Sequence, residues 1–114
     1  MFGATIDLNH LSRYTGGNES INAEVLRLFE TQTTELVGKL QSILEAADAK
    51  SWKEVTHALK GAAKGVGAFS FAEAVAAAEP IDPARDHEGA ERAMVHIRQN
   101  AEAVKRFVDS YLAR

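Results

Sequence analysis

The sequence has no cysteine, two prolines and a single tryptophan in 114 residues. Without cysteine the chain forms no disulfide and no thiolate metal site, so its stability has to come from a packed core. No apolar run approaches the ~20 residues needed to cross a bilayer, and residues 1–10 lack the charged start and hydrophobic centre of a signal peptide. We therefore expect a cytoplasmic protein that does not insert into membranes.

Basic runs are also missing. The chain has 13 Lys and Arg against 16 Asp and Glu, a formal net charge of -3, and no interleaving of aromatic with basic residues. This balance argues against nucleic acid as the main partner. At 114 residues and 46% hydrophobic, the chain can bury one core but not two. We expect a single domain over residues 1–114 and, because no symmetric surface seam is evident, a monomer.

Apolar residues recur at spacings of three and four, and no segment alternates with a period of two. This pattern predicts helices throughout and no strand. Glycine, proline and capping residues divide the chain into a short helix followed by four main helices. The predicted fold is an all-α, antiparallel four-helix bundle with a short additional N-terminal helix.

The expected helix boundaries follow from capping residues and breakers. The first helix has Asp7 near its start and Gly16-Gly17 at its end, and Asn18 or Ser20 caps the start of the second. Capping boxes at residues 51–54 and 70–73 start the third and fourth helices. Pro80 and Pro83 bound a turn, after which Asp82 or Asp86 caps the start of the last helix.

His57 lies on the solvent side of the third predicted helix. The apolar residues of that helix form one stripe, and His57 falls about 180° from the centre of the stripe. Gly61 follows one turn later, so the surface beside the imidazole has no side chain. A glycine inside a helix costs roughly 1 kcal/mol relative to alanine. The pattern therefore favours an exposed imidazole with a flat approach for a partner. The stripe consists of Trp52, Val55, Leu59, Ala62 and Val66.

The segment from His57 to Ala68 reads HALKGAAKGVGA. It resembles the phosphoacceptor segment of histidine-containing phosphotransfer (HPt) domains: H-x-L-K-G, two small residues, two variable positions, an aliphatic residue, glycine and a small residue. The resemblance implies a helical bundle in which His57 accepts a phosphoryl group from an aspartyl-phosphate of a receiver domain and passes it to another. The implied partners are response-regulator receiver domains and hybrid histidine kinases. No cofactor is expected on this chain, because Mg²⁺ belongs to the receiver.

The same resemblance assigns roles around His57. Lys60 matches the fixed lysine and is expected to give electrostatic support, and Gly61 gives clearance. Lys53 and Lys64 form a cationic collar with Lys60 and are expected to contact the partner, since such charges suit phosphate oxygens and an acidic surface. Ala68 is also expected to contact the partner. We interpret Gly67, the second fixed glycine, as structural.

Two further expectations concern the groups around the imidazole. The segment Phe29-Glu30-Thr31-Gln32 resembles an F-x-x-Q segment of the family, whose glutamine can lie near the active histidine, so Gln32 is a candidate orienting group. Histidine with an unperturbed pKa near ~6.5 needs no catalytic base at neutral pH. We expect no triad-like buried carboxylate at the imidazole, with Glu54 as the only nearby candidate.

A metal-binding four-helix bundle is the alternative from another class. Glu54 and His57 have the E-x-x-H spacing, but di-iron bundles need two such pairs pointing inward, and here one pair points outward. His87 and Glu91 lie one turn apart at a helix start, where a solvated pair is the simpler interpretation. We expect no metal site.

Two alternatives keep the same face of the helix. The dimerisation domain of a sensor kinase usually has an acidic residue after the histidine and a Thr-Pro break, and Ala58-Leu59-Lys60-Gly61 has neither. No glycine-rich ATP-binding module is present, so we expect a phosphoryl carrier without autonomous kinase activity. A non-catalytic adaptor that binds receiver or kinase domains remains open.

Overall fold

The computed structural model describes residues 5–113; residues 1–4 and 114 of the predicted domain lie outside the described part. Residues 5–113 contain five α-helices and no strand, which confirms the predicted fold class. None of the helices described is long and apolar enough to span a membrane. The helices are α1 (Leu8–Thr15), α2 (Glu19–Ala46), α3 (Ala49–Val66), α4 (Phe69–Ala78) and α5 (His87–Leu112).

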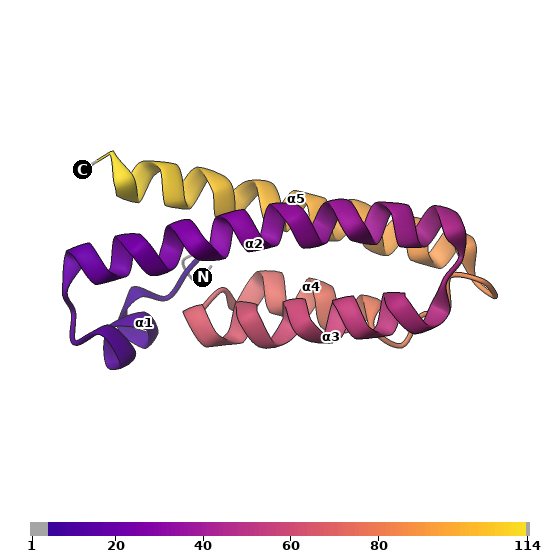
Figure 1. The fold of residues 1–114 in the computed structure, drawn as a ribbon, viewed down its shortest axis with the longest axis horizontal. Coiled ribbons are helices and arrows are strands. Elements are labelled where there is room, and N and C mark those ends of the chain that lie inside the picture. Colours follow the sequence, from indigo (N-terminus) through magenta and orange to yellow (C-terminus); the bar gives the residue numbers. More distant parts are fainter. Residues whose placement is uncertain (1–4, 114) are drawn as a thin grey trace.

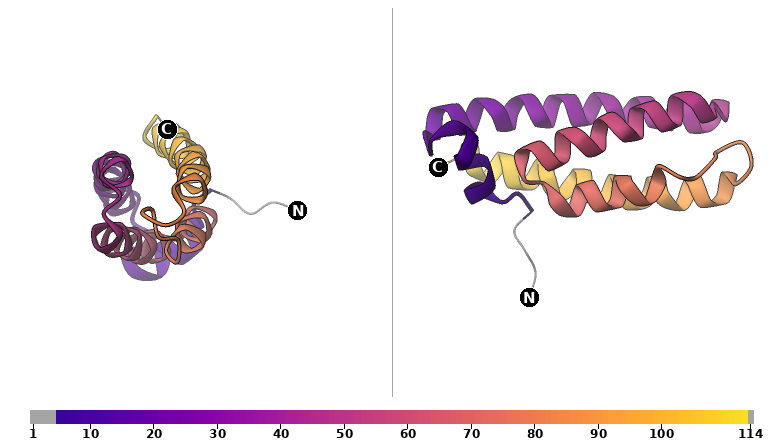
Figure 2. Two further views of the ribbon diagram at one scale, coloured as in Figure 1. Left: turned by 90° about the vertical axis from the view of Figure 1, so that its right-hand side faces the viewer. Right: turned by 90° about the horizontal axis from the view of Figure 1, so that it is seen from below.

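Helices α2 to α5 run antiparallel in an elongated bundle of 45 × 28 × 22 Å (Figures 1 and 2). Each of them packs against two neighbours, in the cyclic order α2, α3, α4, α5. Helix α4 has 10 residues whereas α2 has 28, so α4 covers only part of the length of the bundle. Short α1 lies at the end where α2 begins and α3 ends (Figure 1). In this order, the hairpin formed by α3 and α4 makes up one side of the bundle.

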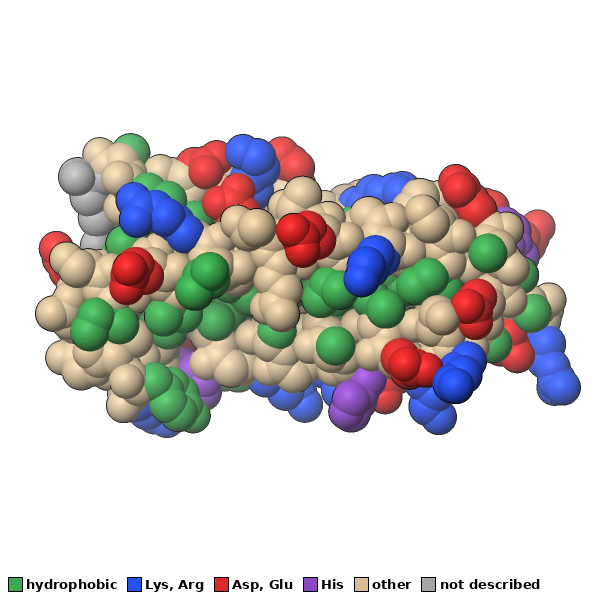
Figure 3. Space-filling model, in the orientation of Figure 1, with side chains coloured by type: hydrophobic (Ala, Val, Ile, Leu, Met, Phe, Trp, Pro, Cys, Tyr) green, Lys and Arg blue, Asp and Glu red, His purple; other side chains and the backbone are tan. Residues whose placement is uncertain are grey.

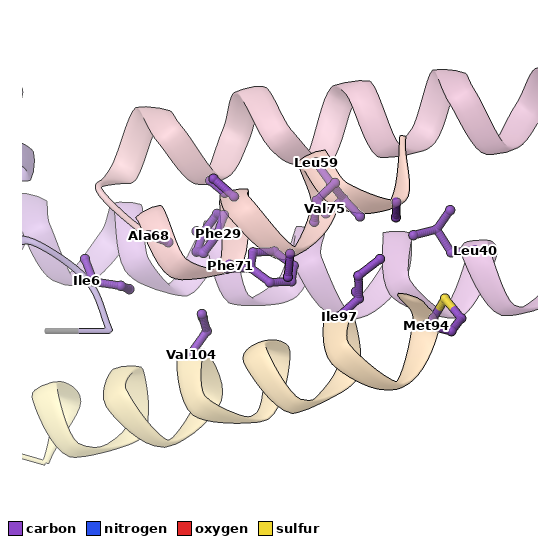
Figure 4. Packing of buried hydrophobic residues seen from close by; sticks show 14 of the residues in the cluster. Ile6, Phe29, Leu40, Leu59, Ala68, Phe71, Val75, Met94, Ile97 and Val104 are labelled. Carbon is purple, nitrogen blue, oxygen red and sulfur yellow. The ribbon is translucent and has the colours of Figure 1, made fainter. Parts of the chain in front are cut away.

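The core lies between the four helices α2 to α5, and all of them contribute to it (Figure 4). Phe29 of α2 and Phe71 of α4 pack edge to face, with ring centroids 6.3 Å apart. Leu59 of α3 and Ile97 of α5 are fully buried in the same cluster. Each large apolar side chain buried in this way contributes about 1.5–3 kcal/mol to stability. The apolar stripe of α3 is thus fixed inside the bundle, and its opposite face is left outside.

Three of the five predicted helix starts were correct. Asp7, Asn18 and Asp86 cap α1, α2 and α5 as expected. The two capping boxes were wrong: α3 begins earlier, at the N-cap Asp48, and Ser51 donates its hydroxyl hydrogen to Asp48 Oδ2 at 2.7 Å from inside the first turn. The hydrogen bonds from Ser51 lower the pKa of Asp48. Helix α4 begins at Phe69 without a side-chain cap, because its start is set by the tight connection from α3.

Gly67 joins the end of α3 to the N-terminal segment. Its φ of +84° belongs to the left-handed region that favours glycine. The Asp7 N–H donates to the Gly67 carbonyl at 2.9 Å, and a Cβ on Gly67 would lie 2.8 Å from the Asp7 carbonyl oxygen. The structural interpretation of Gly67 is confirmed, and α1 is held against the end of α3.

Candidate functional site

His57 lies on the outer face of α3. Its side chain is 74% exposed, whereas Trp52 and Leu59 of the same helix are fully buried. Thr56, next to His57, is also buried and donates its hydroxyl hydrogen to the Trp52 carbonyl at 2.8 Å. Histidine, basic and acidic side chains gather along the α3 edge of the bundle (Figure 3). The predicted exposure of His57 is confirmed.

Gly61 leaves bare backbone one turn beyond His57. The residue is exposed, and a Cβ built on it would meet no other atom within 4 Å. The packing of this chain therefore does not require a glycine at position 61. Since glycine weakens a helix, the stability of α3 does not account for its presence either.

Glu79, at the C-cap of α4, faces His57 and was missed by the sequence analysis. Its Oε1 lies 3.6 Å from His57 Nδ1, and its Oε2 lies 2.9 Å from Lys60 Nζ. The side chains of Glu79 and Lys60 are only 19% and 24% exposed. The expectation that Glu54 is the only carboxylate near the imidazole is wrong, because the partly buried carboxylate of Glu79 lies beside the ring. Glu54, the predicted candidate, is exposed instead.

The number of residues on each side of the turn between α3 and α4 explains how Glu79 comes to lie beside His57. The two residues lie equally far on either side of Ala68, where α3 turns into α4: 68 − 57 = 11 and 79 − 68 = 11. In an antiparallel helical hairpin, such residues come level with each other. This count was the signal in the sequence that would have found Glu79.

Lys60 stabilises the ionised form of Glu79. Donation from the Lys60 ammonium lowers the pKa of Glu79; burial opposes this, and the charges of Lys60 and His57 add to the lowering. At 3.6 Å the contact with His57 Nδ1 is longer than a hydrogen bond and is electrostatic. A carboxylate beside Nδ1 favours the tautomer that carries hydrogen on Nδ1. The Nε2 lone pair is then free on an exposed ring.

The other two predicted lysines are exposed on α3. Lys53 lines an open hollow beside His57 and Glu79, together with Lys50 and Glu54. Lys64 lies about three turns beyond Lys53, past Gly61. Both ammonium groups thus remain on the outer face of α3, where a partner of negative charge can reach them.

Two predicted site residues are not at the imidazole. Ala68 is fully buried at the turn between α3 and α4, where its N–H donates to the Ala63 carbonyl at 2.8 Å. Its predicted contact with a partner is wrong, because the turn packs it into the core. Gln32 is exposed on α2, and no hydrogen bond links it to His57 within the described residues. The side chain that lies beside the ring is that of Glu79.

Potential metal ligands do not gather around His57. Among residues 5–113, no group of three or more His, Cys, Asp or Glu side chains is arranged to hold a metal ion. His87 and Glu91 form an ion pair of 2.8 Å at the start of α5. The described residues give the metal-binding alternative no support.

A family model described as Hpt domain matches residues 24–107. The match covers most of the chain and includes His57, Lys60, Gly61 and Glu79. The chain belongs to the Hpt domain family. Comparisons with curated proteins and with solved structures gave no match. Hpt domains are phosphoryl carriers rather than kinases, they interact with receiver and kinase domains, and membership supports a histidine phosphotransfer role in phosphorelays. Helix α1 of this Hpt domain lies outside the match.

Proposed function

We propose that His57 of this Hpt domain carries a phosphoryl group between aspartates of receiver domains in the cytoplasm. The observation that carries the proposal is the exposed imidazole, with an ionised carboxylate at Nδ1 and bare backbone at Gly61. These features leave Nε2 as the accessible nucleophile. A receiver can then approach without meeting a side chain one turn along the helix.

The transfer is a displacement at phosphorus. The Nε2 lone pair of neutral His57 attacks the phosphorus of the aspartyl-phosphate, an N–P bond forms, and the bond from phosphorus to the aspartate oxygen breaks. The aspartate leaves as a carboxylate, so no proton is needed on the leaving group. The transition state is loose and in line, and catalysis is mainly positioning and charge stabilisation. We propose that the receiver supplies the Mg²⁺ and that this chain needs no cofactor.

Glu79 and Lys60 act on the charge of the ring. As Nε2 donates its electron pair, positive charge develops on the imidazole, and the hydrogen on Nδ1 becomes more acidic. The Glu79 carboxylate stabilises this charge and holds the ring, as a carboxylate does for a catalytic imidazole in general. Lys60 balances Glu79 when the ring is neutral. Transfer in the reverse direction uses the same groups.

The proposal is tested by incubating the protein with a phosphorylated receiver and following an acid-labile label. His57→Gln should abolish labelling and leave the helical content unchanged. His96→Gln is the matched control, since His96 is also an exposed helical histidine and lies on α5. We expect it to be labelled at the wild-type rate. Label that persists in His57→Gln would exclude His57 as the acceptor.

A further inference from the structure

Glu79 lies where a helix gives way to a loop. It is the C-cap residue of α4, and Pro80, which has no N–H, follows it directly. Helix ends fray, and their last carbonyls lack partners within the helix. A carboxylate at such a position stays beside His57 only if the local backbone is held by something else.

The backbone next to Glu79 is held by Trp52. The indole N–H of Trp52 donates to the Ala78 carbonyl at 2.9 Å, across 26 positions of sequence. The Ile81 N–H donates to the same carbonyl at 3.1 Å, so both lone pairs of that oxygen are used. Trp52 is fully buried, and α3 packs closely along α4. The two hydrogen bonds enclose Glu79 in a fixed turn.

We propose that Trp52 is a positioning residue for the phosphotransfer site, because its indole N–H fixes the end of α4 and thereby sets Glu79 between His57 and Lys60. The inference rests on the proposed function of His57. The inference links the two faces of α3. The outer face carries His57, and the inner face carries the Trp52 indole, whose hydrogen bond holds the Glu79 carboxylate beside His57. A single rigid helix thus fixes the imidazole and, through α4, its carboxylate.

A buried tryptophan usually finds some partner for its N–H, so burial alone does not establish this role. The distinguishing prediction is that the hydrogen bond, and not the volume of the ring, controls Glu79. Trp52 is the only tryptophan of the chain, so all tryptophan can be replaced with benzothienylalanine. This residue keeps the bicyclic shape and has sulfur in place of the N–H. Trp52→Phe is the genetically encoded second variant.

Three measurements are compared in the wild-type and benzothienylalanine proteins. Carboxyl NMR follows the titration of Glu79, imidazole ¹⁵N NMR follows the tautomer of His57, and label transfer gives the rate. We expect the pKa of Glu79 to rise toward its ordinary value and the His57 signals to move toward an ordinary tautomer mixture. Transfer should slow about fivefold, the change that one typical hydrogen bond supports. In a Glu79→Gln background the replacement should slow transfer no further.

Phe29→Leu is the control for loosening of the core. Phe29 is buried on α2 and contacts Phe71 near the start of α4, away from Ala78. This variant should unfold at a lower temperature with unchanged Glu79 and His57 spectra. Wild-type spectra in the benzothienylalanine protein, or the same spectral changes in Phe29→Leu, would overturn the role of Trp52. Failure of wild-type protein to accept label would instead refute the proposed function, while the spectra still decide the role of Trp52.

Discussion

Replacing Gly61 with glutamine should make the protein more stable and less active at once. The Cβ position at residue 61 is open, so the larger side chain displaces nothing in this chain. Glutamine is a better helix former than glycine, and position 61 lies inside α3. The new side chain would lean toward the N-terminus of the helix, and therefore over the turn that carries His57.

The two effects have different sizes. Glycine in a helix interior costs about 1 kcal/mol relative to alanine, and glutamine recovers about half or more of it, which raises Tm by a few degrees. The loss of activity is larger. Phosphoryl transfer needs the reacting atoms about 3 Å apart, and a misplacement of about 1 Å can cost 10²-fold. We expect transfer from a phosphorylated receiver to slow by at least about tenfold.

The assay combines thermal unfolding with the rate of label transfer. Gly38→Gln is the matched control, because Gly38 is also exposed inside a long helix and also has open space at its Cβ position. Gly38 lies on α2, whereas the contact between His57 and Glu79 joins α3 to the end of α4. This variant should gain similar stability and transfer at the wild-type rate.

Wild-type transfer by Gly61→Gln would refute the argument that the bare surface serves docking. A lower Tm in Gly61→Gln would contradict the open space at that position. Slower transfer in Gly38→Gln to the same extent would show that the effect does not depend on proximity to His57.

Two further predictions concern stability. The pKa of Glu79 is lowered in the folded state, so its contribution to stability is present above its ordinary pKa and is lost as the pH falls through the lowered value. In urea titrations, Glu79→Gln should lose stability at pH 7, and the loss should shrink as the pH falls below the ordinary pKa of Glu79; a loss that does not change with pH would contradict the charge interaction. Gly67→Ala should lower the free energy of unfolding by at least about 2 kcal/mol, because it combines a left-handed φ with a clash against Asp7. Gly16→Ala, with φ +70° and open space, should lower it by about 1 kcal/mol. Equal losses in chemical denaturation would show that the Asp7 contact is unimportant.

Features that depend on local sequence were predicted well. The spacing of apolar residues placed Trp52 and Leu59 inside and His57 outside, because a helix turns by a fixed angle per residue. Asn18 and Asp86 were found as caps because their side chains bond to N–H groups a few positions later. The family resemblance, too, depended on one continuous segment.

Features that depend on the pairing of helices were not predicted. Ala68 was expected at the partner surface, but the turn between α3 and α4 buries it. The start of α3 was missed because Asp48 and Ser51 are both suitable N-cap residues, and they mark two alternative starts of the helix. In the structure Asp48 is the N-cap, and Ser51 hydrogen-bonds to it from the first turn. Gln32 and Glu54 were the polar candidates beside the imidazole, because both could be chosen without knowing how α4 returns along α3.

The sequence by itself determined the helices, the exposed His57 and the bare turn at Gly61, because each depends on residues within one or two turns. Only the tertiary structure placed Glu79 between His57 and Lys60, and the indole of Trp52 beneath the end of α4. Those contacts join residues from different helices, and their geometry is fixed by how the core packs α4 against α3.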